Sequence, residues 1–187
     1  KWKGRLCLRT SKKVYNQSLV AMMIYEYGEG KTEDMVHGWV NNRATSPFPD
    51  DTKAMEAVAA GQCDVTLVNT YYFGRLMEKK PNLPLAIYWP NQNLKGNTGV
   101  HVNISGAGVT RHARHEAEAI RLLEWLSSDK AQNLYADANL EYPVNPRVKP
   151  DPAVTAWGGF KQNPINVSEA GKLQTKAVML MDRAGYK

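Results

Sequence analysis

Three tyrosines, Tyr15 and the adjacent pair Tyr71 and Tyr72, have the types and spacing most suited to chemistry. Cys7 precedes Tyr15 by eight residues, and Cys63 precedes Tyr71 by the same offset. Each cysteine begins a short apolar segment that predicts a strand. If these strands are parallel neighbours, the cysteines lie level at one end and the tyrosines emerge together past the carboxyl ends. Open α/β sheets bind ligands at that edge.

Converging phenols suit one kind of ligand in particular, a hard trivalent cation. Such a cation prefers hard anionic oxygen, and it can displace the phenolic proton even though free tyrosine ionises only near pKa ~10. Three phenolates neutralise Fe³⁺, whereas a zinc site would show His and Cys ligands. The alternative is that Tyr71 and Tyr72 are core or interface aromatics whose hydroxyls are satisfied elsewhere.

Two neighbouring features could assist binding. Arg75 follows Tyr71 by one helical turn, where it could hold a phenolate oxygen, although an ordinary surface arginine is an equal alternative. Ser11, Lys12 and Lys13 precede the first predicted helix, where amide groups and two lysines could bind an anion. A solvated turn also explains these three residues. An oxyanion or a small organic anion is therefore the second candidate ligand.

Composition narrows the class of protein. The 187 residues are 43% hydrophobic, enough for one large domain or two small ones with a real core. No stretch approaches the roughly 18 apolar residues of a membrane helix. The net charge of +6 is spread along the chain, so no nucleic-acid partner is expected. We find no HExxH, GxSxG or Gly-rich phosphate loop, and so predict a binding protein and not an enzyme.

Cys7 and Cys63 are the two cysteines of the chain. Two cysteines so far apart fit either one disulfide or two inert thiols, and they do not make a zinc site.

The elements that must position these residues alternate between strand and helix. Apolar spacing and chain-breaking residues predict strands at 5–9, 64–68, 85–89 and 99–104. They predict helices at 18–29, 32–40, 51–60, 73–80, 116–127, 129–138 and 172–184. Thr32 is a candidate N-cap of the second helix. The four prolines in 143–152 predict an extended segment that crosses between packing units. This alternation indicates an α/β fold with a mainly parallel sheet.

At these residues the sequence resembles the ferric-ion-binding periplasmic proteins of bacterial iron ABC transporters. The resemblance runs across essentially the whole chain and rests on segments 9–17, 69–75, 102–109, 116–127 and 141–146. Its most specific part is the tyrosine pair followed by Arg75, in Asn69-Thr70-Tyr71-Tyr72-Phe73-Gly74-Arg75. Tyr15 places the chain with the tyrosine-rich branch, in which a third phenolate replaces an exogenous anion.

The resemblance implies a periplasmic-binding-protein type II-like fold of two α/β lobes with iron in the cleft between them. It implies that Tyr15, Tyr71 and Tyr72 hold Fe³⁺ and that the protein hands the iron to an iron ABC permease in the inner membrane. It further implies a periplasmic protein, with the signal peptide outside this chain. An oxidising periplasm favours a disulfide between Cys7 and Cys63.

The family is longer than this chain, and it implies a division into lobes. By resemblance, residues 1–101 belong to the second lobe, residues 102–152 return to the first lobe, and residues 153–187 come back to the second. The N-terminal first-lobe segment, which supplies further ligands in the family, is expected as a missing partner. The family's histidine ligand has no match among the histidines of this chain, which are His37, His101, His112 and His115.

Overall fold

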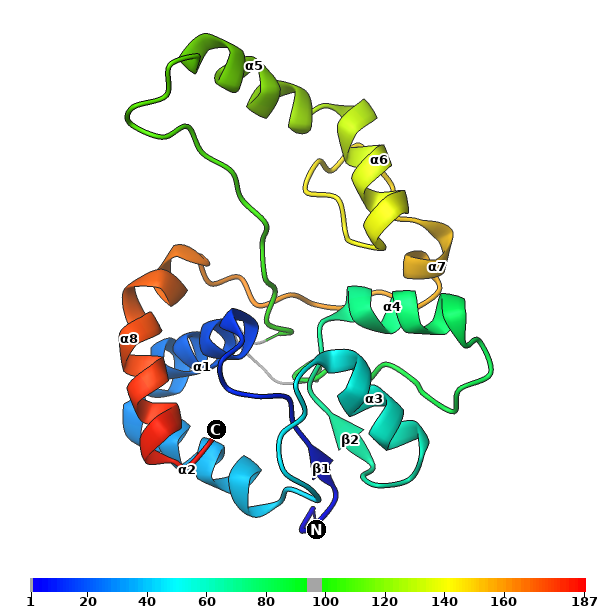
Figure 1. Ribbon diagram of the computed structural model, residues 1–187, viewed down its shortest axis with the longest axis vertical. Coiled ribbons are helices and arrows are strands. Elements are labelled where there is room, and N and C mark those ends of the chain that lie inside the picture. Colours follow the sequence, from blue (N-terminus) through cyan, green and yellow to red (C-terminus); the bar gives the residue numbers. More distant parts are fainter. Residues whose placement is uncertain (1, 94–98) are drawn as a thin grey trace.

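The computed structural model describes residues 2–93 and 99–187. In this part of the chain a body built from β1, β2, α1 to α4 and α8 carries a separate pair of helices, α5 and α6, at the end of two long connecting segments, and the short helix α7 lies on the second of these (Figure 1). The elements are β1 (Leu6–Cys7), α1 (Val14–Tyr27), α2 (Glu29–Asn41), α3 (Asp51–Ala59), β2 (Val65–Thr66), α4 (Thr70–Lys79), α5 (Glu116–Leu126), α6 (Asp129–Asn139), α7 (Pro152–Thr155) and α8 (Ser168–Arg183). None of the described helices has the length and apolar character needed to span a bilayer.

The parallel sheet is smaller than the sequence predicts. β1 and β2 pair in parallel, with Leu6 opposite Val65. The strand predicted at 85–89 does not form, and the one predicted at 99–104 is reduced to a single bridge between Val100 and Gln162. Apolar, β-branched segments become strands only where a neighbouring chain pairs with their backbone groups. In the described residues these two segments have almost no such neighbour.

The helices appear where their periodicity predicts them, with shifted ends. Thr32 is not the N-cap of α2, because that helix begins at Glu29, directly after Gly28. Gly28 has a φ of 82°, a conformation that favours glycine and separates α1 from α2. Thr32 lies buried in the first turn of α2, where its hydroxyl donates to the Gly28 carbonyl at 2.8 Å. The short helix α7 was not predicted.

The main core lies between α1, α2 and α8. Its largest fully buried side chains include Val20, Val36, Leu180, Met181 and Tyr186. Full burial of a side chain of this size contributes about 1.5–3 kcal/mol. α8, from the far end of the sequence, lies along α1 (Figure 1). The first turn of α1, which carries Tyr15, is therefore attached to a rigid support.

Cys7 and Cys63 form a disulfide in a small second core with Ala57. The ladder register places Cys7 opposite Thr66, so the two cysteines are not level, contrary to the reading of their matched offsets. Cys63 instead precedes β2, and the bond runs diagonally from β1 to the turn after α3. The diagonal position gives a Cα–Cα separation of 5.8 Å, which lies within the usual range for a disulfide.

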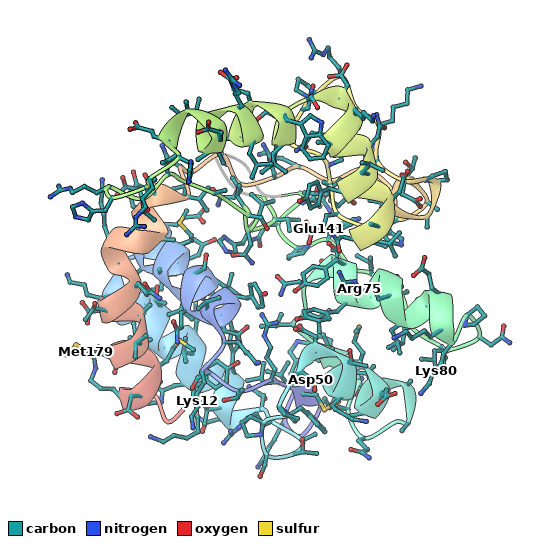
Figure 2. All side chains as sticks on the ribbon, turned by 45° about the horizontal axis from the view of Figure 1, so that its top comes forward. Lys12, Asp50, Arg75, Lys80, Glu141 and Met179 are labelled. Atoms are coloured by element: carbon teal, nitrogen blue, oxygen red, sulfur yellow. A yellow bond between two sulfur atoms is a disulfide. The ribbon has the colours of Figure 1, made fainter. Side chains whose placement is uncertain are left out.

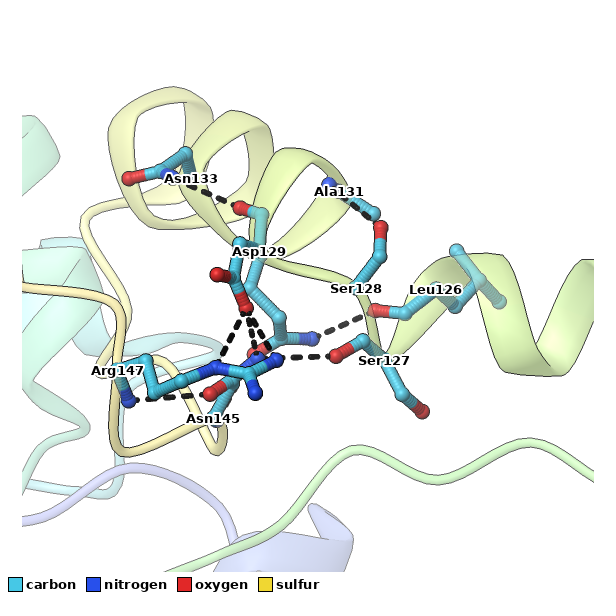
Figure 3. A network of polar contacts seen from close by, with 9 residues as sticks. Leu126, Ser127, Ser128, Asp129, Ala131, Asn133, Asn145 and Arg147 are labelled. Atoms are coloured by element: carbon cyan, nitrogen blue, oxygen red, sulfur yellow. Dashed lines mark hydrogen bonds and ion pairs between the residues drawn. The ribbon is translucent and has the colours of Figure 1, made fainter.

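The proline-rich segment folds back on the junction between α5 and α6, where two of its residues contact Asp129 (Figure 3). Asn145 donates to Asp129 Oδ1 at 2.7 Å, and Arg147 donates to the same oxygen through Nη2 at 2.8 Å. The Arg147 guanidinium, and then Asn145, lower the pKa of Asp129. Asn145 also donates to the Ser127 carbonyl at 3.2 Å. These contacts hold the segment against the two helices.

Two connecting segments join this helix pair to the body, and they meet each other at Val100. Val100 N donates to Lys161 O at 2.9 Å, and Asn163 N donates to Val100 O at 2.8 Å. A Cβ on Gly99 would lie 2.5 Å from the backbone of Gln162, so only glycine permits this approach. The pairing places the second connection at 161–163, beyond the proline-rich segment.

His101, directly after Val100, connects this crossing segment to α1. Its Nε2 lies 3.1 Å from Ser18 Oγ and 3.3 Å from Asn103 Oδ1. Burial holds the pKa of His101 below its usual value, against the opposing effect of the hydrogen bond that the imidazole donates to Asn103 Oδ1. The folded state therefore favours the neutral imidazole.

Reduction of the disulfide should destabilise the protein. The bond spans 56 positions, for which chain entropy predicts a loss of about 4 kcal/mol in the free energy of unfolding. Urea unfolding with and without reductant measures the loss, and a Cys7→Ser/Cys63→Ser variant is the control because reductant should not change it. Two reactive thiols found by titration in denaturant without reductant would contradict the bond.

His101 should make stability depend on pH. Because its pKa is lower in the folded state, its contribution to the free energy of unfolding is complete above the unfolded value of about 6.5. That contribution is lost as the pH falls toward and through the folded-state pKa. Urea midpoints measured across this range should fall more steeply for the wild type than for His101→Gln, whose amide does not titrate. Parallel curves would show that His101 carries no such effect.

Candidate metal centre

The starts of α1 and α4 bring the tyrosines together. Tyr15 is the second residue of α1 and Tyr71 is the second residue of α4, and Tyr72 follows it. The Tyr71 hydroxyl donates to the Tyr15 hydroxyl at 3.2 Å. The rings of Tyr71 and Tyr72 lie 4.2 Å apart between centroids, tilted by 32°. Two phenols that are 56 residues apart in the chain are thus in direct contact.

This meeting has a different cause from the one that the matched offsets suggest. Residues 8–13 connect β1 to α1, whereas the shorter segment 67–69 connects β2 to α4. The difference in connection length offsets the stagger of the disulfide in the ladder. The tyrosines meet because each occupies the same place in its helix.

The surroundings of Tyr71 favour its neutral phenol in the absence of a cation. Burial, and then hydrogen bonding to Tyr15 and Tyr72, raise the pKa of Tyr71 above its ordinary value. A bound cation reverses this preference, because it stabilises phenolate far more than its neighbours oppose it. The arrangement can therefore exchange hydroxyl protons for a metal ion.

A buried ion pair that the sequence analysis missed lies beneath the tyrosines. Arg9 pairs with Asp51, and their side chains are only 4% and 3% exposed. Burial raises the pKa of Asp51, and the guanidinium of Arg9 opposes that effect. Arg9 also donates from Nε to Asn16 Oδ1 at 2.8 Å, and its guanidinium carbon lies 4.9 Å from the centroid of the Tyr15 ring. Sequence offered no signal for this pair, because a charged residue at a helix start is ordinarily solvated.

Asparagines extend these contacts to the crossing segment. Asn69, at the N-cap position of α4, donates its backbone N–H to Asp51 Oδ1 at 3.2 Å. Asn103 donates to Asn69 Oδ1 at 3.1 Å, and Asn103 in turn contacts His101. A continuous series of polar contacts therefore runs from the crossing segment to the helix that carries Tyr71.

A hollow of ≈ 320 Å³ opens on the same side as Tyr15. Its wall combines apolar surface from Val14 and Ile104 with polar groups of Tyr15, Ser18 and Asn103, and α8 completes it. Of the three tyrosines, Tyr15 is the one that lines this hollow.

Arg75 contacts the ring of Tyr71 and not its oxygen. Its guanidinium carbon lies 5.0 Å from the ring centroid, and Nη2 donates to Asn139 Oδ1 at 2.7 Å. Arg75 thus links α4 to the end of α6 (Figure 2). In this arrangement it shields one face of the phenol, whereas a bond to the phenolate oxygen remains a prediction.

The candidate anion-binding residues do not gather with the tyrosines. Ser11 and Lys12 line a different hollow, of ≈ 550 Å³, beside Met179 of α8 (Figure 2). The Ser11 N–H is already bonded to the Lys187 carbonyl at 3.1 Å. Lys13 occupies the N-cap position of α1 without a side-chain cap bond. Anion binding by these residues stays a prediction.

The donor set at the tyrosines fits a hard cation. Within residues 2–93 and 99–187 there is no group of three or more His, Cys, Asp or Glu side chains that could hold a metal ion. The oxygen donors gathered at the starts of α1 and α4 are phenols, which suit a trivalent ion better than a divalent zinc or copper ion.

Comparison with known proteins finds relatives that are described by iron uptake or ferric iron binding. Iron uptake protein A2 of Synechocystis sp. is 40% identical over all of this chain and 55% of its own length. The Fe(3+)-binding periplasmic protein of Serratia marcescens is 26% identical over 98% of this chain and 53% of its own length. The chain spans about half the length of the curated relatives it matches.

Solved structures agree. The Trichodesmium protein described as IdiA or FutA, in complex with iron and citrate, matches with a TM-score of 0.93 and 42% identity over 100% of this chain and 60% of that one. Ferric iron-binding protein A of Mannheimia haemolytica in an open conformation matches with a TM-score of 0.92 and 36% identity over 99% and 58%.

These matches confirm the fold class, the two-lobed periplasmic-binding-protein type II-like fold, and the family resemblance inferred from the motifs. The family model of the bacterial extracellular solute-binding proteins matches residues 1–157. Since this match covers most of the sequence, the chain belongs to the bacterial extracellular solute-binding protein family.

Proposed function

We propose that this chain is part of the substrate-binding component of an iron ABC transporter, and that Tyr15, Tyr71 and Tyr72 bind its Fe³⁺ substrate as phenolates. The observation that carries the proposal is the hydrogen bond of 3.2 Å between the Tyr15 and Tyr71 hydroxyls, with the Tyr72 ring in contact with that of Tyr71. The names of the relatives, which describe iron uptake and ferric iron binding, support the same substrate.

Binding would couple iron to protons. Burial keeps the pKa of Tyr71 high in the absence of a cation, so its phenolate would form as iron displaces its proton. Three phenolates then balance the charge of Fe³⁺. Acidification would favour release, because protons compete with the ion for the same oxygens.

The compartment and partner follow from the same role. A periplasmic location suits a protein that holds its substrate for a permease in the inner membrane, and an oxidising compartment suits the Cys7–Cys63 disulfide. In this proposal the signal peptide lies outside the chain. The role is binding and transfer, without catalysis.

The chain would contribute the second lobe and part of the first lobe. In this proposal residues 1–101 and 153–187 form the second lobe, and residues 102–152 are the returning part of the first. α5 has no buried residue, and its Ile120, Leu122 and Trp125 are each more than two-fifths exposed. Leu134 and Tyr135 of α6 are similarly exposed. Such apolar surface is expected to pack against the first-lobe segment of a longer protein.

An oxyanion or small organic anion is the alternative ligand. The hollow beside Tyr15 offers hydroxyl and amide groups from Ser18 and Asn103. Ser11 and Lys12, however, lie in the other hollow, so the charges expected to attract an anion are not at the tyrosines. A visible phenolate-to-iron absorption band would distinguish iron binding from anion binding.

Tyr72→Phe should remove most of that coloured complex and leave the fold intact, because phenylalanine keeps the ring and deletes only the oxygen. Affinity for Fe³⁺ should fall by more than the roughly tenfold that loss of an outer partner costs. Iron titration followed by absorbance measures both effects. Tyr88→Phe is the control, since Tyr88 is 84% exposed. An iron titration unchanged from the wild type would exclude Tyr72 as a ligand.

The chain alone should bind iron more weakly and reversibly than a version with the first lobe restored. Closure strengthens binding only if both lobes contact the ion in the closed state. Competition against a chelator of known strength, run on both proteins, measures the difference. Equal affinities would show that the second lobe makes the whole site and would remove the two-lobe mechanism. The restored lobe should also suppress self-association through α5 and α6, which sedimentation can follow.

A further inference from the structure

We infer that the buried ion pair of Arg9 and Asp51 is a positioning device, which sets the spacing between the two helix starts that carry Tyr15 and Tyr71. The inference rests on the proposed function in that Fe³⁺ is the probe that reads the spacing. The geometry itself is a property of the chain without iron.

One side of the pair holds α1. Arg9 donates from Nε to Asn16 Oδ1 at 2.8 Å, and Asn16 is the residue directly after Tyr15. The guanidinium carbon lies 4.9 Å from the centroid of the Tyr15 ring, within the range of a cation–π contact. The same group therefore contacts both the Tyr15 ring and the side chain of the residue that follows it.

The other side of the pair holds α4. Asp51 accepts the Asn69 N–H at Oδ1, at 3.2 Å, and receives Arg9 on its other oxygen, Oδ2. Asn69 is the N-cap position of α4 and precedes Tyr71 by two residues. One carboxylate thus connects the guanidinium that orients Tyr15 to the backbone that begins the helix of Tyr71 and Tyr72.

The C-terminal end of the chain closes the arrangement. The Tyr186 hydroxyl donates to the Arg9 carbonyl at 2.8 Å and accepts a hydrogen bond from Asn16. Tyr186 is 1% exposed, and its ring edge packs on Trp39 with centroids 6.5 Å apart. Arg9 consequently has little freedom to move relative to α1.

Stability alone is a poor explanation for the pair. A buried ion pair pays a large desolvation cost, and well-packed apolar residues of similar volume often replace such a pair with no loss of stability. What apolar residues cannot reproduce is the directed contacts to Asn16 and to the Asn69 N–H. These contacts end beside the two tyrosine positions, which is where a small displacement would alter a metal site.

The test replaces the pair with apolar residues, in Arg9→Met/Asp51→Leu. This change removes the directed contacts without leaving a single buried charge. We expect the variant to fold, to bind Fe³⁺ about ten- to a hundredfold more weakly, and to show a shifted phenolate-to-iron absorption band. The band reports the Fe–phenolate geometry, so a merely structural role would leave it in place.

The matched control is the exposed pair of Arg5 and Asp64, whose side chains are 46% and 49% exposed. It also joins the two strand regions, but none of its contacts reaches the tyrosines. Arg5→Met/Asp64→Leu should bind iron with the affinity and band of the wild type. A loss of binding equal to that of the buried-pair variant would overturn the inference.

A second variant decides the matter if the apolar pair does not fold. Arg9→Lys keeps a positive charge beside Asp51 but lacks the planar fork that reaches Asp51 and Asn16 together. It should retain its thermal midpoint and still lose about tenfold in iron affinity. Wild-type affinity and band in whichever variant folds would overturn the inference.

Absence of any iron band in the wild type would instead refute the proposed function. Tyrosine ring NMR signals of the iron-free chain would then test the positioning directly, and signals unchanged in the variant would overturn it.

Discussion

The buried contact between Arg9 and Asp51 is the constraint around which the binding body is built. Two charged side chains at 4% and 3% exposure require a complete set of partners, because an unpaired charge in that position would cost several kcal/mol. Asn16 at the start of α1 accepts from the Arg9 guanidinium, and the Asn69 N–H at the N-cap of α4 donates to the Asp51 carboxylate. The ion pair therefore holds the starts of α1, α3 and α4 in one arrangement, and the Tyr186 hydroxyl adds a bond to the Arg9 backbone carbonyl.

That arrangement prepares a cluster whose charge state depends on its ligand. The phenols of Tyr15, Tyr71 and Tyr72 lie close enough to share protons, and burial makes ionisation of Tyr71 unfavourable in the absence of a cation. Arg9 and Asp51 form an ion pair and so largely offset each other's charge, whereas the Arg75 guanidinium contacts the Tyr71 ring. In the proposed role, three phenolates would match the charge of a trivalent ion better than that of a monovalent or divalent one.

The remaining part of the structure connects the body that carries this cluster to α5 and α6. Two connecting segments pair at Val100, Gly99 permits their close approach, and aromatic rings pack around the return path. Trp89 stacks on Phe160 with centroids 4.4 Å apart, and Phe160 in turn meets Tyr142. The connection is narrow and well packed, while α5 and α6 beyond it keep large apolar side chains in solvent. This contrast fits the proposed role of α5 and α6 as part of a second lobe.

The local sequence was sufficient for the helices other than α7, since their periodicity and glycine stops act within a few turns, but it did not give their ends or the cap of α2. It was also sufficient for the fold class and for the tyrosine pair followed by Arg75, because adjacent residues at a helix start keep their spacing in any fold. The tertiary structure decided the rest. The segments at 85–89 and 99–104 have strand-like composition, but strand formation needs a partner that composition does not specify. The stagger of Cys7 against Cys63, the contact of Arg75 with the Tyr71 ring, and the Arg9–Asp51 pair each join residues far apart in the chain. Such contacts are selected by packing and by the need to satisfy buried charge, and neither can be read from a residue's immediate neighbours.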